Sequence, residues 1–63
     1  MSDVLKHLSK KIQEDLRNIE EDMAMGNASD FGAYKYGCGI YRGLLMANNH
    51  IMELAQYMEN DDD

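Results

Sequence analysis

The stretch that decides the fold is MGNASD, residues 25–30, because long segments of helical spacing lie on both sides of it. Gly26 can take the left-handed conformation that commonly follows a helix, so it marks the end of the first helix. Ser29 or Asp30 can cap the next one, because a short oxygen-bearing side chain accepts hydrogen bonds from the first free amides. A link this short, residues 26–29, predicts two antiparallel helices.

Upstream of this turn, apolar residues recur at intervals of three and four, with lysine, glutamate and aspartate between them. They are Val4, Leu5, Leu8, Ile12, Leu16, Ile19 and Met23. This spacing predicts an amphipathic helix over residues 3–25.

Downstream of the turn, a second helix is predicted over residues 30–60, and it carries two apolar seams. One comprises Ile40, Leu44, Ala47, Ile51, Leu54 and Met58; the other comprises Tyr34, Cys38, Tyr41, Leu45, Asn48, Met52 and Ala55. A helix that is apolar on most of its circumference is buried on most sides, and one neighbouring helix cannot provide that cover. The expected fold is therefore all-α: one antiparallel two-helix hairpin, residues 1–60, assembled into a helical-bundle oligomer and followed by an acidic tail, residues 61–63.

The second seam is the predicted oligomer interface, and three residues near the end of the second helix extend it. Folding the chain back at Gly26 leaves Leu54, Tyr57 and Met58 beyond the start of the shorter first helix, with nothing over them. Within the seam, Asn48 is a candidate for setting the register between subunits, as buried polar residues do in coiled coils.

Glycines inside the second helix also require a reason, because each costs about 1 kcal/mol relative to alanine. Gly39 and Gly43 lie four apart on one face, which favours a close helix crossing. The alternative is a ligand site. In that interpretation Tyr34 and Tyr36 stack on nucleotide bases, while Lys35 and Arg42 bind phosphate.

Composition excludes several classes of protein. The chain has 63 residues, a formal net charge of −6 and one cysteine. The acidic balance disfavours direct binding to nucleic acid, and no apolar run is long enough to span a membrane. An internal disulfide is impossible, and Cys38 suits a reducing compartment. We found no cofactor motif, no metal-ligand set and no catalytic pair, so the protein is expected not to be an enzyme.

At MGNASDFGAYKYGCGIYRGLLMANNHIMEL, residues 25–54, the sequence resembles a group of very short tailed-bacteriophage proteins. The resemblance covers Ile12 to Met58. The matching positions are Gly26, Ala28, Asp30, Tyr34, Gly39, Arg42, Gly43, Leu44, Ala47 and Ile51. Gly32 and Gly37 depart from the group, whose members often carry a larger or charged residue there.

The resemblance implies phage origin and a hairpin fold. With the doubly apolar second helix, it favours an oligomeric virion or assembly component located in the host cytoplasm or in the virion. The expected partner is another copy of the chain, with a phage structural protein or a host protein as the other candidates. Two further functions stay open: an inhibitor that docks its acidic segments on a basic host protein, and an oligomeric sponge for signalling nucleotides.

Overall fold

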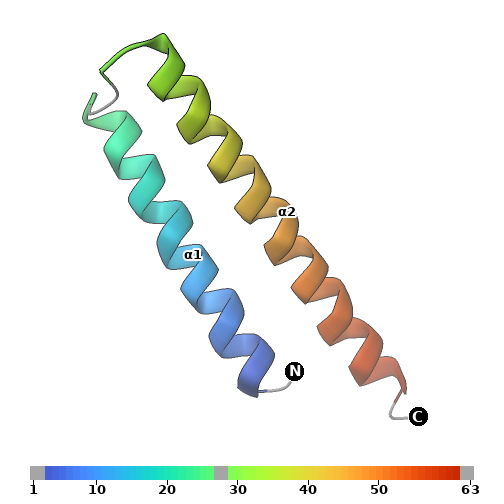
Figure 1. The fold of residues 1–63 in the computed structure, drawn as a ribbon. Coiled ribbons are helices and arrows are strands. Elements are labelled where there is room, and N and C mark those ends of the chain that lie inside the picture. The colour runs from blue at the N-terminus through green and yellow to red at the C-terminus, as the bar shows by residue number, and fades with distance from the viewer. Residues whose placement is uncertain (1–2, 27–28, 62–63) are drawn as a thin grey trace.

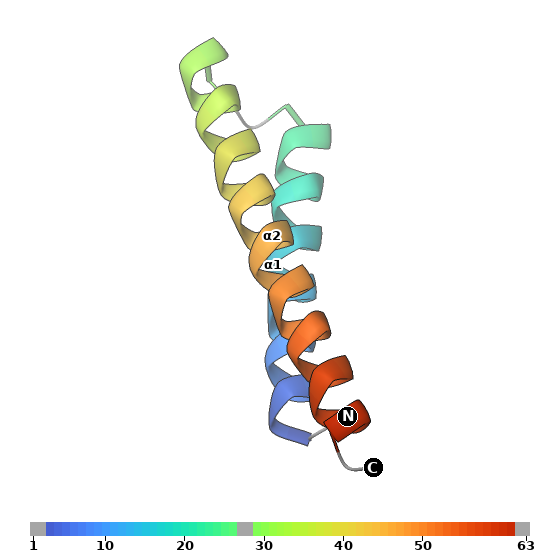
Figure 2. The same cartoon turned by 90° about the vertical axis from the view of Figure 1, so that its right-hand side faces the viewer.

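A computed structural model describes residues 3–26 and 29–61, which form two helices, α1 (Asp3–Ala24) and α2 (Phe31–Asp61). The helices lie side by side and run in opposite directions, as Figures 1 and 2 show from two sides. The predicted helical hairpin is thus confirmed. The first helix starts at residue 3 as predicted, and the other three helix ends differ from the predicted ones by one residue; Asp61, assigned to the acidic tail, belongs to α2.

The start of α2 and the end of α1 have the local chemistry that the turn sequence predicts. Gly26 has a φ of +72°, in the left-handed region that favours glycine, and its amide donates a hydrogen bond to the Met23 carbonyl at 3.1 Å. At the other end of the link, the Ala33 amide donates to Asp30 Oδ1 at 2.7 Å. Asp30, rather than Ser29, therefore provides the side-chain cap of α2.

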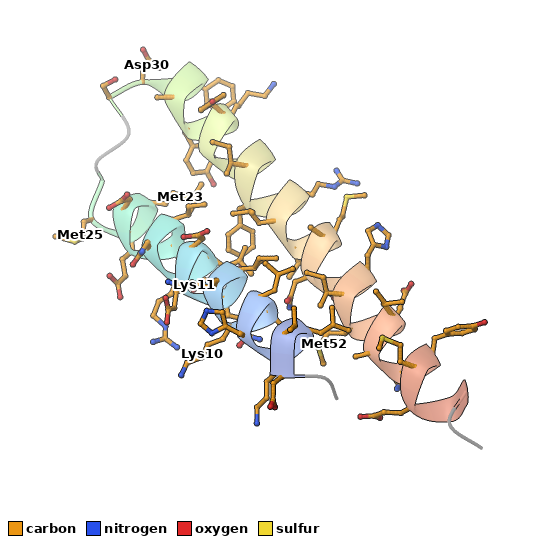
Figure 3. The ribbon with its side chains drawn as sticks, turned by 60° about the horizontal axis from the view of Figure 1, so that its bottom comes forward. Lys10, Lys11, Met23, Met25, Asp30 and Met52 are labelled. Carbon is orange, nitrogen blue, oxygen red and sulfur yellow. The ribbon has the colours of Figure 1, made fainter. Side chains whose placement is uncertain are left out.

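The interface between the helices is narrow and shallow (Figure 3). Among the described residues, Leu16 and Ala55 are the apolar side chains that are buried, and Ser9 is the buried polar one. Around them lie half-buried apolar residues: Leu5, Ile12, Ile19, Met23, Leu44, Ala47 and Ile51. One stripe of α1 thus packs on one stripe of α2, and most of the remaining surface faces solvent.

The extra length of α2 is divided between the two ends of the hairpin. Ser9 pairs with Asn48 and Glu20 with Tyr41. Six residues separate Ser9 from Asp3 and six separate Asn48 from Leu54, so the start of α1 lies level with Leu54 and the last turns of α2 continue past it. At the turn end, the first residues of α2 extend past the end of α1 (Figure 2). The chain does not fold back at Gly26 itself, because α2 begins only at Phe31.

Leu54 thus lies level with the start of α1, and Tyr57 and Met58 lie past it. These three side chains are exposed. That another subunit covers them stays a prediction. Neither helix, within residues 3–26 and 29–61, carries an apolar stretch that could cross a membrane.

Candidate interaction surfaces

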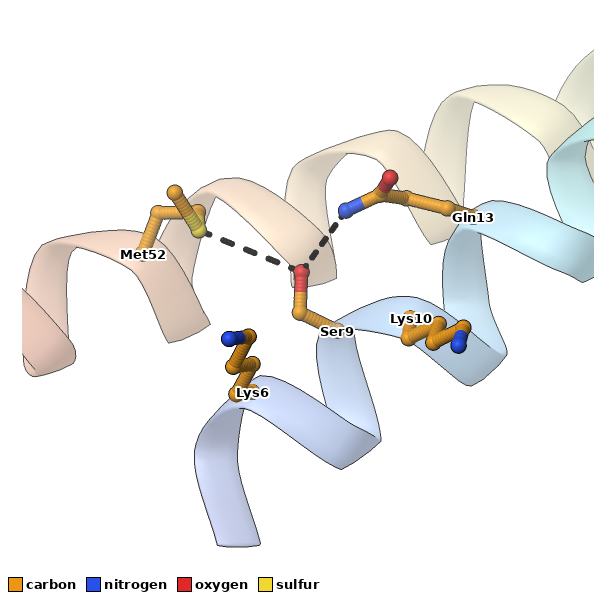
Figure 4. A pocket seen from close by; sticks show the side chains of 5 residues that line it. All are labelled: Lys6, Ser9, Lys10, Gln13 and Met52. Carbon is orange, nitrogen blue, oxygen red and sulfur yellow. Dashed lines mark hydrogen bonds between the residues drawn. The ribbon is translucent and has the colours of Figure 1, made fainter. Parts of the chain in front are cut away.

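A polar cluster lies inside the helix interface, near the open end of the hairpin (Figure 4). The Ser9 hydroxyl, on a side chain that is only 3% exposed, donates to Asn48 Oδ1 at 2.6 Å and lies 3.9 Å from the Met52 sulfur. It accepts a hydrogen bond from Gln13 Nε2 at 3.0 Å. Because every member of the cluster has a partner, it fixes which residues of the two helices face each other.

Sequence reasoning found only one half of this cluster. Asn48 was expected to set a register between subunits, whereas its amide oxygen is bonded to Ser9 of the same chain. Ser9 was missed because the search followed apolar residues alone. Its position was informative, since it lies four residues after Leu5 and three before Ile12 and so shares their stripe.

Two different surfaces flank the interface. On one, Lys6, Lys10, Gln13 and Met52 line an open groove of about 380 Å³ together with Ser9. Helical spacing adds Leu45 to this surface, seven residues before Met52. We call it the lysine side. It is apolar along α2 but polar and basic along α1.

The opposite flank, which we call the apolar side, is apolar along α2, and on α1 it carries Leu8, followed at seven-residue intervals by Asp15 and Asp22. Ser9 of α1 and Asn48 of α2 face each other at the centre of the interface. Lys6, Lys10 and Gln13 lie to one side of Ser9 around α1, and Met52 lies on the same side of the hairpin around α2. Residues on the other side of Ser9 and of Asn48 therefore make up the opposite flank. The apolar side comprises Leu8, Ile12 and Ile19 of α1 with Ile40, Leu54 and Met58 of α2. Leu8, Ile40, Leu54 and Met58 are each exposed by two fifths or more.

The ten residues predicted as an oligomer interface separate into four groups. Tyr41, Asn48 and Ala55 face α1 within the hairpin. The lysine side takes Tyr34, Leu45, Met52 and the half-buried Cys38. The apolar side takes Leu54 and Met58, and Tyr57 points away from α1 altogether. The predicted seam is therefore not one surface, because three of its residues are used inside the chain.

The glycines do not make a close crossing within the hairpin. A methyl group added at Gly39 or Gly43 would meet no atom of the described residues within 4 Å, since both positions face away from α1. Gly37 is the glycine that faces α1, where a methyl group would lie 3.6 Å from the Met23 side chain. Figure 3 shows Met23 on the inner side of α1, whereas Met25 points outward.

The residues proposed for a nucleotide site are not gathered in one chain. Tyr34 and Tyr36 are two positions apart on α2, so their rings leave the helix about 200° apart. The Lys35 ammonium lies 5.5 Å from the centroid of the Phe31 ring, and that ring stacks on Tyr34 at 6.5 Å. Arg42 is exposed on the outer surface of α2. The two tyrosines of one chain therefore face different directions.

Two tyrosine hydroxyls have a raised pKa. The hydrogen bond to Glu20, together with partial burial, raises the pKa of the Tyr41 hydroxyl. The neighbouring Cys38 thiol raises the pKa of Tyr34 through a hydrogen bond and its charge. Within residues 3–26 and 29–61, no three His, Cys, Asp or Glu side chains converge as metal ligands. Both pKa shifts stabilise the neutral form of the tyrosine hydroxyls.

The fold and its surfaces together define a helical hairpin with a thin core and exposed apolar residues on both helices. No protein family model, no curated protein and no solved structure matches this chain.

Proposed function

We propose that the protein is a non-enzymatic component of a bacteriophage that acts through protein–protein contacts, as part of the virion or of its assembly. Its working surface in this proposal is the outside of the hairpin rather than a pocket. The phage origin rests on the sequence resemblance, which covers Ile12 to Met58. The mode of action rests on the distribution of apolar side chains.

The observation that carries the proposal is the apolar side. Leu8, Ile40, Leu54 and Met58 lie on one flank of the hairpin, and each keeps about half of its side chain in water. Single exposed apolar residues are ordinary on protein surfaces, whereas several on one flank of two packed helices are typical of a surface that binds protein. Helices with such rows bind by inserting them between the side chains of other helices.

The experiment is mass spectrometry of purified phage particles and of assembly intermediates, compared with a parallel affinity purification of the tagged chain from infected cells. The proposal predicts that the chain is present in particles or intermediates and that phage structural proteins co-purify with it. If the chain is absent from both and a host protein is enriched in stoichiometric amount, the assembly role is wrong.

That second outcome would favour the inhibitor function. Its supporting observation is the acidic end of α1, where Glu20 and Glu21 are exposed beside the turn. Docking of these carboxylates on a basic protein would weaken steeply with added salt, because the Debye length falls from about 10 Å at 0.1 M to about 3 Å at 1 M. Binding through the apolar side would persist at high salt, since burial of apolar surface is not screened. Salt titration of any captured complex thus separates the two functions.

A further inference from the structure

We infer that the apolar side is the interface of a two-fold symmetric homodimer, in which two hairpins form a four-helix bundle. The inference rests on the proposed function in one respect, because it names the binding partner of the apolar side, the surface by which the protein is proposed to act. It commits to a second copy of this chain as the occupant. The lysine side stays in solvent in this dimer.

The surface area of the hairpin is the first argument. A compact monomer of 7.2 kDa exposes about 4,100 Å² by the usual scaling of surface with mass. The hairpin exposes 5129 Å². The excess of about 1,000 Å² is close to the roughly 800 Å² that each partner buries in a standard-size interface. One symmetric contact would therefore bring each chain to the exposure of an ordinary folded protein.

The shape of the molecule agrees with the surface area. The Cα radius of gyration is 14.8 Å, against about 11 Å for a compact domain of this length. Cα atoms extend 51 Å along the hairpin but only 16 and 12 Å across it. A chain this small, with so few buried apolar side chains, usually requires a disulfide, a metal or a partner subunit for stability. The single cysteine excludes an internal disulfide, and a second copy provides the missing layer.

The choice of side follows from the charges. Docking the lysine side on a copy of itself would bury Lys6 and Lys10 against the same two lysines, and uncompensated burial of ammonium groups is costly. The apolar side presents aliphatic side chains from both helices, and its charged residues on α1 are Asp15 and Asp22, both exposed. The two carboxylates lie further toward the turn than Leu8, so a contact centred on Leu8, Leu54 and Met58 can leave them hydrated. A two-fold axis brings the same patch of each chain together, so an apolar patch is self-complementary and a basic one is not.

A matched pair of leucines tests the inference. Leu54 on the apolar side is 48% exposed and Leu45 on the lysine side is 41% exposed, and both lie in the middle or later part of α2. The variants are Leu54→Lys and Leu45→Lys. Light scattering coupled to size exclusion would measure the mass of each, and circular dichroism would report whether it stays helical. Met58→Lys, at 45% exposure, and Met52→Lys, at 46%, form a second matched pair on the same two sides.

We expect the unaltered chain to have twice the mass of one 7.2 kDa chain and a melting temperature that rises with protein concentration. Leu54→Lys should weaken dimerisation by about 100-fold or more, because both copies bring a charge into the interface. Leu45→Lys should leave the dimer intact. If Leu54→Lys unfolds the chain while Leu45→Lys remains a folded dimer, the inference stands, since folding and association are then coupled through the apolar side.

Three results would overturn the inference. The first is an unaltered chain that is monomeric at 100 μM with a melting temperature independent of concentration. The second is an equal loss of association in Leu54→Lys and Leu45→Lys. The third is a loss in Leu45→Lys alone, which would assign the interface to the lysine side. A monomer that is still found in phage particles would refute the dimer and leave the proposed function in place, with a foreign helix as the partner.

Discussion

The hydrogen bond between Ser9 and Asn48 allows a quantitative test of how the two helices choose their register. We consider a double-mutant cycle of Ser9→Ala, Asn48→Ala and the double variant. Ser9 is 3% exposed and its hydroxyl donates to Asn48 Oδ1 at 2.6 Å, so neither change can be compensated fully by water at this position. A net contribution of about 1 kcal/mol is typical of such a bond.

The single variants mix this bond with other effects. Ser9→Ala removes the hydroxyl but gains up to about 0.7 kcal/mol of helix propensity, so its net cost should stay below about 1 kcal/mol. Asn48→Ala leaves a buried hydroxyl whose remaining acceptor is the weak Met52 sulfur, at 3.9 Å, and should cost about 1–2 kcal/mol. In the cycle the propensity differences cancel. The double variant should therefore be about 1 kcal/mol more stable than the sum of the two single changes predicts.

Urea unfolding followed by circular dichroism measures these free energies, with all variants at one protein concentration because association changes the apparent stability. Asn49→Ala in place of Asn48→Ala is the matched control. Asn49 is the same residue type, one position along and exposed, and its coupling to Ser9 should be zero. A coupling energy between Ser9 and Asn48 below about 0.3 kcal/mol would refute the reasoning that this pair selects the register.

Three further predictions concern single positions. Gly43→Ala should stabilise the hairpin by up to about 1 kcal/mol, because the methyl group meets no described atom within 4 Å, and a loss of stability or association on thermal melting would instead indicate a close crossing. Asp30→Ala should cost about 1 kcal/mol in urea unfolding and Ser29→Ala much less, since Asp30 alone caps the Ala33 amide; equal effects would contradict the cap. Because Glu20 raises the Tyr41 pKa, the folded state retains this proton above the unfolded pKa of about 10, so stability should fall as pH rises past that value. Tyr41→Phe should reduce that fall, as urea titrations between neutral and alkaline pH can measure.

The helical hairpin was predictable because the sequence features that start and end its helices are local. The left-handed conformation at Gly26 and the side-chain cap at Asp30 each depend on residues within a few positions, and both occur. Helical spacing likewise needs no knowledge of distant residues, and α2 remains one helix although glycines stand at four positions inside it. The candidate interaction surfaces also depend on how the two helices pack against each other. The register of the two helices depends on contacts between distant residues, such as the Ser9–Asn48 hydrogen bond.

The sequence by itself determined two helices, one turn and an antiparallel hairpin, because periodicity and capping act over one or two helical turns. Only the tertiary structure decided which stripe of α2 faces α1. The two seams of α2 lie side by side and have the same helical spacing, so periodicity cannot choose between them. The choice depends on contacts between distant residues: the Ser9–Asn48 hydrogen bond, the small Ala55 and the close approach of Met23 to Gly37. That choice turns Leu54 and Met58 outward beside Leu8, and so makes the apolar side.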